Sequence, residues 1–176
     1  LYLFFSMQSR FQEGLEAFGR AVTGLLNPPG GSPTSGRIQP DLVLGKLLVR
    51  QGSFCMELGH RAHGQELLEK GFVFLCRSGH RQETAFALIQ LGGLAYDEGD
   101  YAQARQCHQE SLTLCQQAGD RWGTARAFLF LGTAATQLGE YGEAQQYFQA
   151  SSSICRELGD QILLARALNN LAIVHY

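Results

Sequence analysis

Small and apolar residues recur along most of this chain with the spacing of an α-helix. In the window 88–95 they stand at i, i+3, i+4 and i+7, and a second stripe with the same spacing runs from Ala104 to Cys115. This periodicity predicts amphipathic helices that each turn one face toward a core. Glycines separate the stripes and predict helix ends, because Gly readily adopts the left-handed conformation found there: Gly59, Gly79, Gly99, Gly119, Gly139 and Gly159. Asp120 and Asp160 stand where the next helix needs an N-cap.

The whole pattern repeats every 40 residues. Residues 86–125 and 126–165 are identical at 14 of 40 positions, where chance would give about two or three. The earlier copy, 46–85, matches the next at 8 of 40 positions. Each copy holds two helical stripes and predicts an antiparallel helix pair, which cannot bury its apolar face without stacked neighbours. Small residues are expected where the paired helices approach closely: Gly92, Ala95, Ala104, Gly132, Ala135 and Ala144.

The repeat also predicts the domain organisation. Residues 41–176 form one continuous solenoid domain, with copies at about 41–80, 81–120 and 121–160 and a final half repeat at 161–176. Residues 1–26 form a partial N-terminal helix pair, joined by an inter-repeat loop at 27–40 that is rich in Pro and Gly. Because position 1 is Leu rather than Met, we expect a fragment of a longer protein.

The residues that recur resemble the tetratricopeptide repeat. Leu-Gly stands early in the first helix, Gly-Asp-Tyr or Gly-Glu-Tyr at the turn, Ala three residues after that Tyr, and an aromatic such as Phe148 four further on. The family's usual repeat has about 34 residues, whereas this longer form is similar to repeats in the sensor regions of bacterial multidomain regulators, namely maltose-activator-like transcription activators and STAND-class signalling ATPases. The resemblance implies an all-α, right-handed superhelical solenoid of antiparallel helix pairs.

The resemblance also implies a concave groove, lined mainly by the first helix of each pair, that receives a peptide or a partner helix. Three bases share one repeat position, Lys46, Arg126 and Arg166. Because Arg binds carboxylates bidentately, we expect an amphipathic or acidic peptide. Alternatively, these bases are simply solvated, and Phe86, Ile89 and Phe130 pack within the stack. The predicted groove residues are Lys46, Arg50, Ser53, Met56, Phe86, Ile89, Gln90, Tyr96, Arg126, Leu129, Thr133, Arg166, Asn169 and Ile173, with Val49, Gly93, Phe130, Thr136 and Asn170 beside them.

The net charge and the cysteine content limit the classes of binding partner and the cellular compartment that we expect for this chain. The net charge of −2 and pI near 6.2 give no basic patch, so we expect no direct binding of nucleic acid or of an anionic membrane. The apolar start at residues 1–5 is too short for a membrane span. Five cysteines in helical patterns predict buried, reduced thiols and a cytoplasmic protein.

Sequence motifs that would indicate catalysis, phosphate binding or metal binding are weak or absent, so we expect neither an enzyme nor a cofactor. Residues 31–38 resemble a phosphate-binding loop, but Arg37 and Ile38 replace its Lys and Ser or Thr. No C-x-x-C pair accompanies His60 and His63, so no metal site is expected. No Gly-x-Ser-x-Gly nucleophile motif occurs. Tyr101, its repeat equivalent Tyr141, and Trp122 are expected to be packing anchors at helix junctions.

The sequence thus favours a protein- or peptide-interaction module, the sensory or scaffolding fragment of a larger bacterial regulator. One alternative is a sensor for a small-molecule inducer, with Tyr96, Thr133, Asn169 and the bases around a polar ligand. A closed, aromatic-lined pocket would favour that alternative, and an open groove would favour a protein partner. A third hypothesis is a homodimer formed through an exposed apolar face of the C-terminal helix, at Leu168, Leu171 and Ala172.

Overall fold

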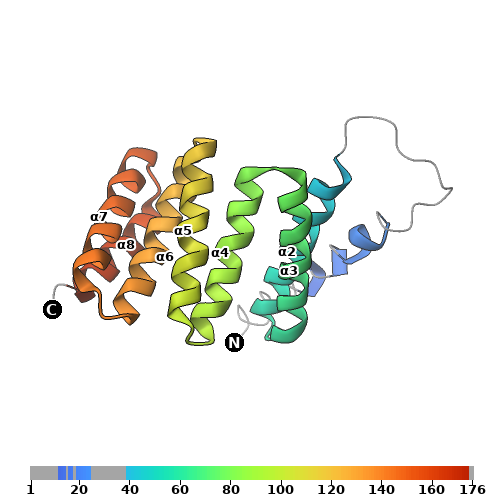
Figure 1. Ribbon diagram of the computed structural model, residues 1–176, viewed down its shortest axis with the longest axis horizontal. Helices are drawn as coiled ribbons and strands as arrows, with labels where there is room; N and C mark the ends of the chain where they lie inside the picture. The colour runs from blue at the N-terminus through green and yellow to red at the C-terminus, as the bar shows by residue number, and fades with distance from the viewer. Residues whose placement is uncertain (1–11, 15, 18, 25–38, 175–176) are drawn as a thin grey trace. The chain divides into compact units, whose positions relative to one another are not determined.

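A computed structural model describes residues 12–14, 16, 17, 19–24 and 39–174, and the regular structure throughout these residues is α-helical. The predicted all-α class is therefore confirmed. Successive helices form antiparallel pairs, α2 with α3, α4 with α5 and α6 with α7, and α8 follows as a first helix (Figure 1). The helices are α2 Pro40–Glu57, α3 Arg61–Ser78, α4 Arg81–Asp97, α5 Tyr101–Ala118, α6 Arg121–Gln137, α7 Tyr141–Leu158 and α8 Gln161–Val174.

The chain divides into two compact units, residues 1–83 and 84–176, and the division falls inside α4. A single continuous domain over 41–176 therefore stays a prediction. Most of the predicted loop at 27–40 lies outside the described residues, but Pro40 is the first residue of α2, so the loop ends one residue earlier than expected. The described parts of residues 12–24 are helical.

The predicted helix ends are confirmed. All six separating glycines have positive φ, from 68° at Gly119 to 83° at Gly99. The carboxylate of Asp120 accepts a hydrogen bond from the backbone N–H of Gly123 at 2.8 Å, and that of Asp160 accepts one from Leu163 at 2.9 Å. These bonds satisfy N–H groups that the first turn of a helix leaves unpaired.

Within the second unit, the paired helices approach closely at glycines, as predicted. A Cβ atom on Gly132 of α6 would lie 2.5 Å from Cε1 of Phe148 in α7, so only Gly fits beside that buried ring. Serines forty residues apart add a matching hydrogen bond in each pair. Ser111 Oγ donates to the Ala85 carbonyl at 2.9 Å, and Ser151 Oγ donates to the Ala125 carbonyl at 2.8 Å.

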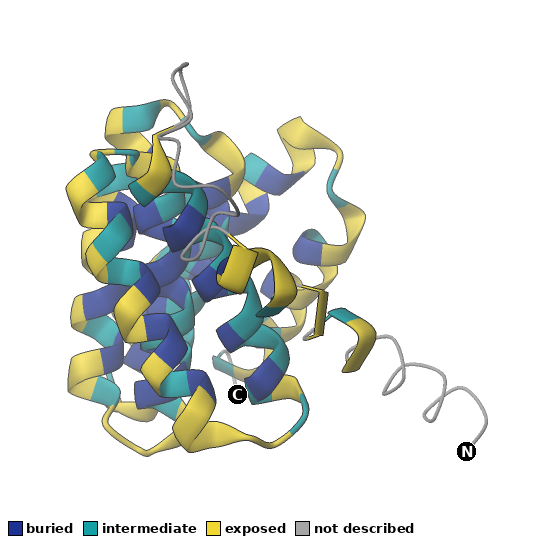
Figure 2. Cartoon of the chain, turned by 90° about the vertical axis from the view of Figure 1, so that its right-hand side faces the viewer, coloured by how far each residue is buried: buried dark blue, intermediate teal, exposed yellow. Residues whose placement is uncertain are grey.

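Burial follows the predicted stripes, with buried and exposed residues on opposite sides of most helices (Figure 2). Cysteines 55, 107, 115 and 155 are buried, whereas Cys76 is exposed and departs from the expectation. The predicted anchors Trp122 and Tyr141 are 47% and 58% exposed, so neither is a buried packing residue. No helix in the described part of the chain is long and apolar enough to cross a membrane.

Candidate ligand-binding site

The second unit contains a pocket of about 360 Å³ lined by the first helices of three successive repeats, α4, α6 and α8. Helix α5 contributes one side chain, His108. The lining combines aromatic, amide, hydroxyl and charged groups: Gly93, Tyr96, Asp97, His108, Phe130, Thr133, Arg166, Asn169 and Asn170. A mixture of apolar walls and a few converging polar groups is typical of binding sites.

The aromatic ring of Phe130 organises the cationic side of this pocket. The imidazole of His108 stacks on it with ring centroids 5.2 Å apart and an interplanar angle of 23°. The guanidinium carbons of Arg126 and Arg166 lie 6.0 Å and 5.9 Å from its centroid. Such cation–π contacts favour positions of the guanidinium near the ring. Among the described residues no acid forms an ion pair with Arg166, so its guanidinium is available to an anion.

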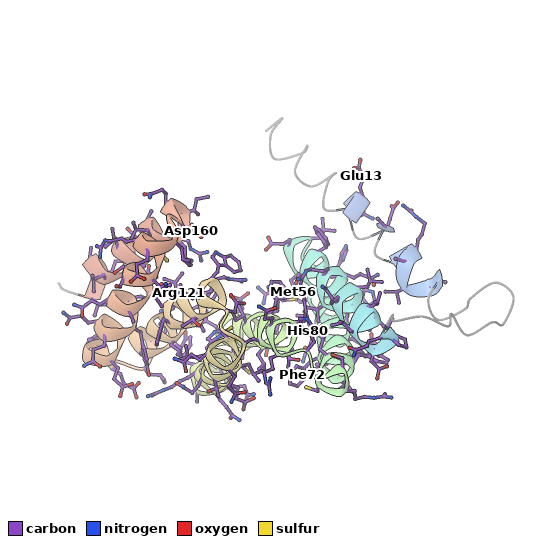
Figure 3. All side chains as sticks on the ribbon, turned by 90° about the horizontal axis from the view of Figure 1, so that it is seen from above. Glu13, Met56, Phe72, His80, Arg121 and Asp160 are labelled. Carbon is purple, nitrogen blue, oxygen red and sulfur yellow. The ribbon has the colours of Figure 1, made fainter. Side chains whose placement is uncertain are left out.

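Arg126 is also held by rings outside the pocket. Its guanidinium carbon lies 4.6 Å from the centroid of Trp122 and 5.4 Å from that of Phe86. The indole N–H of Trp122 donates to Asp160 Oδ2 at 2.9 Å. Asp160, which is labelled in Figure 3, stands directly before α8, whose first residue is Gln161. Hydrogen bonds from the Leu163 backbone and then from Trp122 hold the pKa of the Asp160 carboxyl below its usual range. This carboxylate therefore connects the start of α8 with the aromatic support of Arg126.

His108 is the buried polar group of the pocket wall. Its side chain is 1% exposed, and its Nδ1 has no hydrogen-bond partner in the described part of the protein. Burial foremost, and the nearby charge of Arg126, lower the pKa of the imidazole to about 4. The ring is therefore neutral at neutral pH and carries one N–H donor and one acceptor nitrogen.

Of the remaining polar groups of the pocket, some already form hydrogen bonds within the protein. The Tyr96 hydroxyl accepts a hydrogen bond from Gln137 Nε2 at 2.9 Å, and Thr133 Oγ1 donates to the Leu129 carbonyl at 3.0 Å. Asn169 and Asn170 present amide groups, which both donate and accept. A second hollow of about 230 Å³ shares Tyr96, Thr133 and Asn170 and extends to Ile173.

Several of the predicted groove residues therefore lie together, at the pocket or at the second hollow beside it. Tyr96, Thr133, Arg166 and Asn169 line the pocket, and Ile173 lines the second hollow. Phe86 and Arg126 lie against each other beside it, and Gln90 of α4 is half-buried.

Two predicted groove residues do not face outward, and this is a correction. Ile89 is 4% exposed and Leu129 is 1% exposed. Leu129 packs in one core cluster with Leu163 and Ala167 of α8, because its repeat position faces the neighbouring helices of the stack. Val49 of α2, the equivalent residue two repeats earlier, is predicted beside the groove and is buried as well. For Ile89 the alternative interpretation, packing within the stack, therefore holds.

The predicted residues of the first unit are engaged with their own neighbours. Lys46 Nζ lies 2.9 Å from Glu83 Oε1, and Arg50 lies 3.1 Å from Oε2 of the same carboxylate. Ser53 Oγ donates to the Val49 carbonyl at 2.9 Å. Met56 packs on Gly64, where an added Cβ would lie 2.8 Å from its sulfur. Lys46 therefore differs from its repeat equivalent Arg166, since an acid of its own unit pairs with it.

Sequence reasoning missed Asp97 and His108. Asp97 is exposed at the pocket edge, where an acid on a polar helix face gives no signal in the sequence. His108 falls in a buried stripe, but the equivalent positions one repeat away hold Leu68 and Phe148. A polar residue at a position that is otherwise apolar was the signal that could have identified it.

Metal binding finds no support in the described ranges, where no group of three or more His, Cys, Asp or Glu side chains converges. His60 and His63 are exposed, and His63 Nδ1 lies 3.8 Å from a Glu66 carboxylate oxygen.

Two solved structures share the fold at low sequence identity. BtubC (BKLC) from P. vanneervenii superposes with a TM-score of 0.79 at 15% identity, covering 97% of this chain and 67% of its own. A Rap protein complexed with Competence and Sporulation Factor gives 0.77 at 14% identity, covering 98% of this chain. The present chain spans only 45% of that Rap protein.

No curated protein matches the chain in sequence. The sequence profile of the tetratricopeptide repeat matches residues 83–157 and 123–176, which together make up more than half of the chain and include every residue named in the pocket. The chain belongs to the tetratricopeptide repeat family.

Proposed function

We propose that the second unit is a protein-interaction module that holds a peptide segment of a partner in its pocket. The observation that carries the proposal is the convergence of Tyr96, Phe130, Arg166 and two asparagines from the first helices of three successive repeats. Membership of the tetratricopeptide repeat family supports it, because these repeats are typical of non-enzymatic interaction scaffolds. We propose the same non-enzymatic role here.

The pocket chemistry suggests what such a peptide contributes. Asn169 and Asn170 can hydrogen-bond to both the N–H and the C=O of a peptide backbone. Phe130 and Tyr96 offer apolar surface, and Arg166 can bind a carboxylate with paired hydrogen bonds. An amphipathic or acidic segment fits this combination.

The wider setting remains part of the proposal. We propose that the chain is the sensory or scaffolding part of a larger bacterial regulator, as its 40-residue repeats suggest. The Rap protein, crystallised in complex with Competence and Sporulation Factor, supports the idea that this fold forms complexes. A cytoplasmic location stays a prediction from the cysteine pattern.

The test is a displayed random-peptide library selected against the wild-type chain. Enriched peptides are then measured against Arg166→Glu and Asn170→Ala, with Arg156→Glu as the control, since Arg156 is an exposed arginine of α7 that does not line the pocket. We expect acidic peptides whose affinity falls by a factor of about ten or more for the pocket variants, as for loss of a charge-assisted hydrogen bond. Equal losses for all three variants, or no enriched consensus, would exclude this binding site.

The size of the pocket favours a second candidate, a small polar effector. A volume of about 360 Å³ lies within the usual range for small-molecule sites. Thermal unfolding of the wild type in the presence of a metabolite library would detect it, because a ligand that binds only the folded chain raises Tm. A stabilising compound whose effect disappears in Arg166→Glu would favour the effector over the peptide.

Self-association through α8 also remains a proposal. Of the predicted face, Leu168 is 40% exposed and Ala172 is exposed, whereas Leu171 is half-buried and packs against the core cluster. Sedimentation of the wild type and of Leu168→Lys would test the proposal. A dimer that Leu168→Lys dissociates supports it, and a monomeric wild type at high concentration rejects it.

A further inference from the structure

One position in α5, the second helix of its pair, carries a different kind of residue from the equivalent positions of the other repeats, and it lies at the pocket. Position 108 is a histidine, while the equivalent residues forty positions earlier and later are Leu68 and Phe148. All three side chains are buried, with exposed fractions of 1% for Leu68, His108 and Phe148. An imidazole therefore stands at a core position that the other two copies fill with an apolar side chain.

The side chain at this position packs against a glycine of the preceding helix in all three copies: Gly52, Gly92 and Gly132. A Cβ on Gly52 would lie 2.9 Å from Leu68, and a Cβ on Gly92 would lie 2.7 Å from His108 Nδ1. The local packing is thus the same, and the repeat geometry alone does not require a histidine. A buried polar atom without a partner destabilises a fold, whereas Leu or Phe at this position avoids that loss.

The imidazole also belongs to the pocket wall. Among the pocket residues named above, His108 is the one whose side chain is buried, and the others are half-buried or exposed. Its ring stacks on Phe130, which is itself beside Arg166. Its Nδ1 is enclosed beside Gly92, whereas its Nε2 is not enclosed and has no hydrogen-bond partner among the described residues. A group that enters the pocket between these side chains therefore meets a neutral imidazole that can form a hydrogen bond through Nε2.

We propose that His108 selects the group that enters the pocket, by hydrogen-bonding through Nε2 to a side chain that ends in an amide, hydroxyl or carboxyl group. This inference rests on the proposed function, since it assumes that a peptide side chain occupies the pocket. It makes His108 a specificity-determining residue, where Arg166 and the asparagines supply general affinity. An apolar anchor of equal size would leave Nε2 without a partner and bind more weakly.

The first test compares selections from one displayed peptide library on the wild type, His108→Leu and His108→Phe. The two variants carry the residues that this protein uses at the equivalent positions, so the fold is expected to persist, and far-UV circular dichroism checks it. We expect a polar anchor residue from the wild type and an apolar anchor from both variants, within the same flanking consensus. The same anchor from all three proteins would overturn the inference while leaving the proposed function intact.

The second test does not depend on finding a peptide. The imidazole nitrogens of ¹⁵N-labelled His108 are observed by NMR while N-acetyl-asparaginamide or N-acetyl-leucinamide is added to the full chain. We expect the asparagine analogue to shift the Nε2 resonance in a saturable way, and the leucine analogue of similar size to leave it unchanged. Equal responses to both compounds, or no response to either, would overturn the inference even if the library yields a binding peptide. Conversely, a selective shift without any enriched peptide would contradict the proposed peptide binding, while it would support the selection of polar groups by His108.

Discussion

At the scale of single residues, His108 makes the unfolding free energy depend on pH. Its pKa is lowered from 6.5 to about 4 in the folded chain. Between these values the unfolded chain binds more protons than the folded chain, so stability falls as the pH is lowered through this window. We expect a loss of about 3 kcal/mol between pH 7 and pH 4 from this residue alone, at about 1.4 kcal/mol per pKa unit.

The measurement is urea unfolding at a series of pH values, for the wild type and for His108→Leu. We expect the difference in unfolding free energy between the two proteins to change across pH 6.5 to 4 in favour of the leucine variant. Below pH 4 the difference should become constant, since histidine is then protonated in both states. Parallel stability curves throughout would contradict the buried, neutral imidazole.

A pair of glycines gives a second prediction at this scale. Gly132→Ala places a methyl group 2.5 Å from the buried ring of Phe148, whereas Gly142→Ala in α7 meets nothing within 4 Å. Overpacking costs about 1–3 kcal/mol, and the higher helix propensity of Ala contributes up to about 1 kcal/mol. We therefore expect Gly132→Ala to lower the urea midpoint and Gly142→Ala to raise it. A rise for both variants would show that Phe148 moves aside without loss.

At the scale of helices, Asp160 joins the start of α8 to Trp122. One carboxylate oxygen accepts the Leu163 N–H and the other accepts the Trp122 indole N–H, both at 2.9 Å. We expect Asp160→Ala to cost about 1 kcal/mol, as for loss of an N-cap. Trp122 is the one tryptophan in the sequence, so its fluorescence should change in the same variant.

The control for this prediction is Glu157→Ala. Glu157 pairs with Arg121 at 2.5 Å on the surface, where both side chains are more than half exposed. Such pairs contribute about 0–1 kcal/mol, so we expect a smaller change in stability and an unaltered Trp122 emission. Equal effects of the two substitutions would show that Asp160 acts as a surface charge rather than as a cap.

The same helices show how far the sequence specifies the site. The 40-residue spacing of Gly and Asp predicts the helix ends, because only a few residue types suit those backbone positions. Periodicity was less informative about which side of a first helix faces outward. Ile89 and Leu129 stand close in register to true pocket residues, yet they pack into the stack. The stacking of Arg126 on Trp122 and Phe86 depends on side-chain geometry between helices, which spacing alone does not encode.

At the scale of the whole chain, the second unit contains every residue named in the pocket. Repeat proteins are stabilised by contacts within and between neighbouring repeats, so a run of complete repeats can fold alone. A fragment of residues 78–176 keeps α4 intact, with the Glu83 N–H bonded to His80 Nδ1 at 3.4 Å at its start. It also keeps the core of Leu129, Phe148 and Leu163.

We expect this fragment to fold cooperatively and to retain the binding site. The far-UV circular dichroism signal per residue should stay helical. The fluorescence emission of Trp122 should match that of the full chain, since its partners Asp160 and Arg126 are both present in the fragment. The His108 resonance should respond to N-acetyl-asparaginamide as in the full chain. A helical fragment that loses this response would show that residues before 78 complete the site, whereas an unfolded fragment would show that the second unit depends on the first for its stability.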